Sequence, residues 1–172
     1  METPRRRLTA AALLAQPATG QRKARAELRR AAEIDRRNLA DQYRAARALQ
    51  IAGDPAASLV YIERLTGIDP DYRDTQFLLG WAHQSAGRGP PAIAAYRRFL
   101  GANPDHAQAR FNLGFALKET GDCRAAVAQF ERVLALDAAM RSAHAHLAAC
   151  YRALGDGARA AAHQTLYDRN TR

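Results

Sequence analysis

The chain has 172 residues, 48% of them apolar and 25% charged, which is a balance typical of a folded globular chain. No apolar run approaches the ~20 residues of a membrane-spanning helix, so we expect no membrane span. The net charge of +9 arises at the two ends, because residues 1–38 hold ten basic against four acidic side chains and residues 141–172 hold five against two. Alanine is abundant and aromatic residues make up only 7%, which predicts an all-helical fold.

The first 20 residues imitate a secretory leader, with basic, then apolar, then small side chains. The apolar stretch at 8–15 is short and rich in alanine, and Pro17 lies where a cleavage site would be expected. We therefore expect a cytoplasmic protein, with a secreted or periplasmic one as the alternative. Residues 1–20 are expected to form a poorly ordered basic segment.

Residues 21–38 predict one amphipathic helix. Ala24, Leu28 and Ala31 recur at helical spacing and share a face. The segment is either a degenerate half-repeat or a helix that packs on the N-terminal side of the units that follow.

The basic side chains of this segment raise an alternative function, which is binding to nucleic acid or to an anionic surface. Acidic residues such as Glu27 and Glu33 are interleaved with the basic ones, however, and no aromatic side chain is available for stacking on bases. That pattern is typical of a solvated helix face with ion pairs, so nucleic acid is the less expected partner.

From residue 39 onward the sequence has a period of 34 residues. The glycines that mark it are Gly53, Gly87, Gly121 and Gly155. Each glycine predicts a left-handed end to a first helix, and the aspartates that follow three of them suit the start of a second helix. These aspartates are Asp54, Asp122 and Asp156. A fixed period of this length indicates stacked two-helix units.

Small residues recur inside the predicted helices. Gly80 and Gly114 lie in the middle of first helices, where glycine costs about 1 kcal/mol relative to alanine. We expect two helices to touch there, with Ala92 and Ala126 as the matching contacts on the second helices. Large apolar residues are expected to surround the contact, and they include Leu79, Tyr96, Leu113 and Phe130.

These features resemble the tetratricopeptide repeat family. Residues 107–140 match its pattern along their full length, and residues 73–106 match nearly as well. Residues 39–72 and 141–172 match more loosely, and the last copy stops two residues short. The resemblance implies an all-α, right-handed superhelical solenoid of antiparallel helix pairs, whose first helices line a concave groove.

In the resembling family, ligands lie along this groove at the second, fifth, ninth and twelfth positions of each repeat. The aromatic residues at these positions are Tyr43, Phe77, Trp81, Phe111 and Phe115. The polar residues there are Arg47, Gln50, Asp74, Gln84, Lys118 and Arg152. Some members of the family clamp the C-terminal carboxylate of a chaperone with lysines and asparagines. In this chain only Asn112 matches such a clamp.

These positions predict a non-catalytic scaffold that binds a peptide or helix of a protein partner through apolar side chains. The alternative is that the four aromatic residues Phe77, Trp81, Phe111 and Phe115 pack between neighbouring repeats. Self-association through the C-terminal repeat is also possible, because Leu166 and Tyr167 are expected to be exposed.

No residue pattern indicates catalysis, a cofactor or a metal site. His144 and His146 are two residues apart in a predicted helix and therefore point to different faces. The two cysteines, Cys123 and Cys150, have neither the spacing of a zinc site nor that of a disulfide framework. Phosphate-binding glycine motifs are absent as well.

Overall fold

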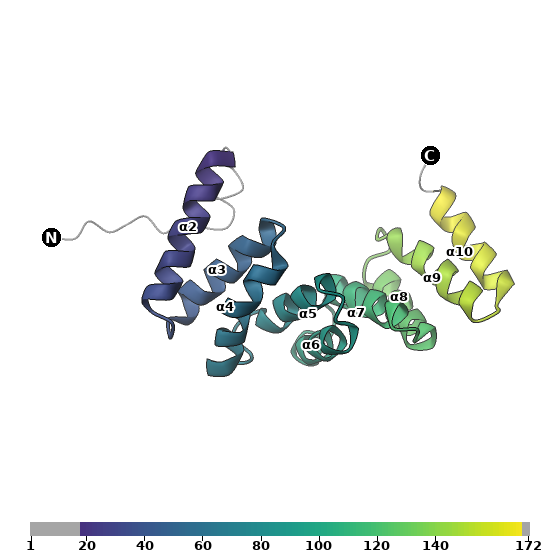
Figure 1. The fold of residues 1–172 in the computed structure, drawn as a ribbon. Helices are drawn as coiled ribbons and strands as arrows, with labels where there is room; N and C mark the ends of the chain where they lie inside the picture. The colour runs from purple at the N-terminus through teal and green to yellow at the C-terminus, as the bar shows by residue number, and fades with distance from the viewer. Residues whose placement is uncertain (1–17, 170–172) are drawn as a thin grey trace. The chain divides into compact units, whose positions relative to one another are not determined.

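The computed structural model describes residues 18–169, and all regular structure within that range is helical, as the composition predicts. Figure 1 shows the helices in chain order. They are α2 (Ala18–Ile34), α3 (Leu39–Ile51), α4 (Pro55–Ile68), α5 (Thr75–Ser85), α6 (Gly89–Ala102), α7 (Ala107–Glu119), α8 (Cys123–Leu136), α9 (Ser142–Ala153) and α10 (Gly157–Arg169). None of these helices is long and apolar enough to cross a bilayer.

The helices form two compact units, one ending at Leu78 and the other beginning at Leu79. In unit 1, α3 packs against both α2 and α4. In unit 2, neighbouring helices from α6 to α10 pack against one another in chain order. Each pair joined by a short turn is the two-helix unit that the period predicts.

Helix α2 starts at Ala18, so residues 18–20 are helical rather than part of an unstructured segment. The residues that follow, Gln21, Arg22, Lys23 and Ala24, are good helix formers, and the helix they form extends back to Ala18. The expectations for residues 1–17, including the leader-like stretch, lie outside the described residues.

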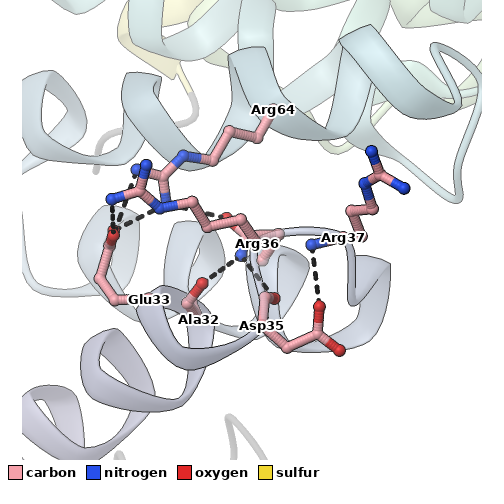
Figure 2. Close-up of polar contacts among 7 residues, drawn as sticks. Ala32, Glu33, Asp35, Arg36, Arg37 and Arg64 are labelled. Atoms are coloured by element: carbon pink, nitrogen blue, oxygen red, sulfur yellow. Dashed lines mark hydrogen bonds and ion pairs between the residues drawn. The ribbon is translucent and has the colours of Figure 1, made fainter.

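Polar contacts hold α2 on the rest of unit 1. The Glu33 carboxylate lies 2.7 Å from Arg64 of α4 and 3.2 Å from Arg36, as Figure 2 shows. The buried Gln42 side chain of α3 donates to the carbonyl of Ala32 at 2.5 Å. The hydrogen bond from Arg64 holds the pKa of the Glu33 carboxyl below its usual value. Of the acidic residues interleaved in this basic helix, Glu33 thus forms ion pairs within the fold.

The turns between paired helices follow the expected glycine chemistry. Each first helix ends two residues before a glycine with a positive φ angle; these are Gly53, Gly87, Gly121 and Gly155, whose φ angles are 76°, 68°, 90° and 80°. Such angles suit glycine because it lacks a Cβ atom. At three of the turns the next residue caps the second helix, and Asp122, for example, accepts from the Ala125 amide at 3.0 Å. The remaining turn has Arg88 at this position, which makes no side-chain cap bond.

Glycine within the first helices permits close contact with an aromatic ring of the second helix. A Cβ atom built on Gly80 would lie 2.5 Å from the Tyr96 ring, and one on Gly114 would lie 3.0 Å from the Phe130 ring. The sequence predicts alanines as the contacts, but the nearest atoms belong to these rings. Ala92 is fully buried beside them, as expected for a small residue at this interface.

Replacing Gly80 with alanine should destabilise the protein, because the new methyl group has no room beside Tyr96. We expect Gly80→Ala to lower the free energy of unfolding by about 1–3 kcal/mol, the usual cost of overpacking. The matched control is Gly101→Ala in α6, where no heavy atom lies within 4 Å of the new Cβ. This control should gain about 0.5–1 kcal/mol from helix propensity. Urea unfolding followed by circular dichroism measures both, and equal effects would contradict the contact.

Candidate partner-binding surface

In unit 1, three of the predicted groove residues meet at one carboxylate. Asp74 accepts from the Tyr43 hydroxyl at 2.6 Å and from the Arg47 guanidinium at 2.9 Å. Burial and the neighbouring Asp74 raise the pKa of Tyr43 to about 12, so its hydroxyl stays protonated and remains a donor at neutral pH. The α3 side chains are thereby fixed to the segment that precedes α5.

Arg73, next to this carboxylate, has a left-handed backbone with φ of 53°. A residue with a Cβ atom loses about 1 kcal/mol or more in that conformation. The Arg73 guanidinium lies over the rings of Tyr43 and Tyr72, at 5.2 and 5.5 Å from their centroids, which offsets part of this cost. The Arg47 guanidinium contacts the Asp74 carboxylate and the Arg73 guanidinium covers the Tyr43 ring, so these three charged groups carry one net positive charge.

Gln50 is not available as a groove residue. Its side chain is only 2% exposed, and its amide donates to the backbone carbonyl of Leu78 at 2.7 Å. The groove positions of the tetratricopeptide repeat family predict on which face of a helix a side chain lies. They do not predict how deeply that side chain is buried. Gln50 therefore supports packing in unit 1, whereas Phe77 is half-buried there.

In unit 2, the polar residues Gln84 and Asn112 gather around one buried tyrosine. The Tyr96 hydroxyl donates to the Gln84 side-chain oxygen at 2.9 Å, and the Asn112 amide is a hydrogen-bond partner of the same hydroxyl. Burial raises the pKa of Tyr96 well above its usual value, so it does not ionise at neutral pH. The Asn112 oxygen also accepts from Gln108 at 3.0 Å. This network links α5, α6 and α7.

Phe111 and Phe115 of α7 contact an imidazole from the next repeat. The His146 ring lies 5.3 Å from Phe111 and 5.5 Å from Phe115, and it stacks on Phe130 at 5.1 Å with an interplanar angle of 18°. Burial, and then the Lys118 charge, lower the pKa of His146 below its usual 6.5. Both phenylalanines remain half-exposed, so they pack between repeats and also face outward.

The remaining predicted residues differ in their surroundings. Lys118 lies 4.9 Å from the centroid of the Phe115 ring and 3.0 Å from the Glu119 carboxylate. Trp81 on α5 is half-buried and makes no hydrogen bond or ring contact with any residue in the described range. Arg152 near the end of α9 is exposed. Trp81 is thus a large apolar side chain whose indole N–H donates no hydrogen bond to the described residues.

Sequence reasoning missed three residues of these clusters. Tyr72 and Arg73 lie in the turn between repeats, which the groove positions do not include. His146 lies one period of 34 residues after Asn112 and so occupies the equivalent position of the next repeat. This equivalence could have identified His146 from the sequence.

Comparison with known families and structures agrees with this architecture. Residues 107–140 and residues 74–106 each match a tetratricopeptide repeat family. Residues 74–140 of this chain are therefore tetratricopeptide repeats. No curated protein sequence matches it significantly.

Solved structures share the fold of this repeat protein. A crystal structure of MamA is 16% identical with a TM-score of 0.79, covering 90% of this chain and 94% of the other. The fragment of MamA from residue 41 onward, from Desulfovibrio magneticus RS-1, is 19% identical with a TM-score of 0.80, covering 87% and 85%. YrrB, described as a tetratricopeptide protein with an unusual peptide-binding site, is 19% identical with a TM-score of 0.79, covering 92% and 80%. At these identities the likeness establishes the fold alone.

Proposed function

We propose that this protein is a non-catalytic scaffold whose first helices bind a peptide or helix of a partner protein. The observation that carries the proposal is Trp81, a half-buried indole on α5 that makes no hydrogen bond or ring contact within the described residues. Large aromatic side chains with an unused polar edge are typical binding hot spots. The peptide-binding site reported for YrrB supports the same use of a shared fold.

The side chains of each unit indicate what the partner contributes. In unit 2, half-exposed Phe111 and Phe115 favour apolar side chains, since burying them against another apolar surface releases water. In unit 1, the cluster of Arg47, Arg73 and Asp74 carries a net positive charge and favours an acidic group. Unit 2 thus favours apolar side chains of a partner, and unit 1 by itself favours a carboxylate. The free thiols Cys123 and Cys150 fit the proposed cytoplasmic location.

Trp81→Ala should weaken binding of such a segment. Peptides selected from a displayed library against the full chain supply the probe, and calorimetry supplies the affinity. We expect a loss of about 2 kcal/mol, or about 30-fold, with unchanged helical content. Trp81 is the only tryptophan of the chain, so its emission in the unmodified protein should also shift when the peptide binds.

The matched control removes an exposed apolar side chain from a second helix. Val60 on α4 is 48% exposed, and Val60→Ala should leave the affinity unchanged. Peptides that bind equally well to wild type and Trp81→Ala, without any shift in tryptophan emission, would remove Trp81 from the binding site.

Self-association through the C-terminal repeat is the second candidate, and the exposure of two leucines favours it. Leu154 is 42% exposed and Leu166 is 40% exposed. A charge placed at such a contact would have to be desolvated, so Leu166→Glu should shift a dimer toward monomer. Sedimentation equilibrium measures this, and a wild-type protein that stays monomeric at high concentration would contradict it.

A further inference from the structure

Two histidines of the last helix pair face each other. The Nδ1 atoms of His144 on α9 and His163 on α10 are 3.0 Å apart, and the ring planes are inclined by 31°. In the sequence, the histidine nearest to His144 is His146, which lies on another face of the same helix. The residues that meet are 19 positions apart and are brought together by the packing of α9 on α10.

The repeat register explains why these two positions meet. One period earlier, the equivalent residues are Arg110 and Gln129 of α7 and α8, and they are joined by a hydrogen bond of 3.1 Å. The packing of a first helix on its second helix therefore brings these two positions together in both repeats. Only the side chains at the two positions differ. In the last repeat both happen to be imidazoles.

We propose that His144 and His163 form a binding site for divalent copper or nickel. Imidazole nitrogen is a preferred ligand of both ions. With metal–nitrogen bonds of about 2.0–2.1 Å, two ligands at a right angle are about 2.9 Å apart, whereas two tetrahedral ligands are about 3.4 Å apart. The observed 3.0 Å fits the right angle, which is the geometry of tetragonal Cu(II) and Ni(II) sites rather than of structural zinc.

The surroundings orient His163 through its contact with Tyr151. The Tyr151 ring stacks on His163 with centroids 5.6 Å apart, and its hydroxyl donates to the Glu131 carboxylate at 2.7 Å. The Arg159 guanidinium lies 5.1 Å from the centroid of the same Tyr151 ring. No three metal-ligating side chains converge anywhere in residues 18–169. Two imidazoles therefore supply the protein ligands, and water completes the coordination of the half-buried site.

Metal binding requires one ring to change tautomer and both Nδ1 atoms to turn from each other toward the ion. In the Nδ1 contact one ring donates its proton and the other accepts, so each neutral imidazole carries one proton. When the ion binds, both protons reside on Nε2 and both Nδ1 lone pairs face the metal. Burial lowers the pKa of both histidines below its usual value. Acid protonates them and should release the ion.

Copper(II) titration of the full chain without a polyhistidine tag tests the proposal, using calorimetry and electron paramagnetic resonance at pH 7.5. We expect one equivalent of copper with hyperfine structure from two imidazole nitrogens. The informative variant is the double substitution His144→Arg with His163→Gln, because it copies the contact already present between Arg110 and Gln129. It should preserve folding and weaken copper binding by about tenfold or more, since loss of even an outer-shell partner costs 10–100-fold.

The control is His106→Asn, which removes an exposed histidine while keeping a side chain suited to cap α7. Its copper affinity should equal that of the wild type. Copper that binds with the same affinity to the folded double variant, or a wild-type protein that binds none, would overturn the proposal.

Discussion

The contact between a helix glycine and an aromatic ring is the constraint on which the rest of unit 2 depends. The Tyr96 ring lies where a side chain on Gly80 would be, and the Phe130 ring does the same at Gly114. Because the two helices of a pair approach this closely, their relative rotation is fixed. Equivalent positions in successive repeats therefore face the same way, which is why a few side chains can be assigned to one surface.

This fixed rotation separates structural from binding roles along each first helix. Deeply placed side chains such as Gln50 and Leu113 support the packing. Other side chains of the first helices, including Phe115 and Trp81, are half-exposed and can contact a partner. The proposed copper site depends on the repeat register, because His144 and His163 occupy the positions at which Arg110 and Gln129 meet in the preceding pair.

The period, the glycine ends and the aspartate caps were all predictable, because each follows from local backbone geometry. The ring contacts of Gly80 and Gly114 were predicted only in part, since spacing identifies a small residue but not the side chain that fills the space. Burial of Gln50 could not be predicted because depth depends on the neighbouring helix. The left-handed Arg73 and the histidine pair arise from tertiary packing, which a linear pattern does not report.

The most direct test is a paramagnetic relaxation map with a spin-labelled peptide selected against the full chain. If the first helices bind the partner, broadening should centre on the indole signal of Trp81 and the ring signals of Phe111 and Phe115. Methyl signals of second-helix residues, such as Val60 on α4 and Ile93 on α6, should stay sharp. Broadening that centres on those methyl groups while the Trp81 indole remains unaffected would contradict the account.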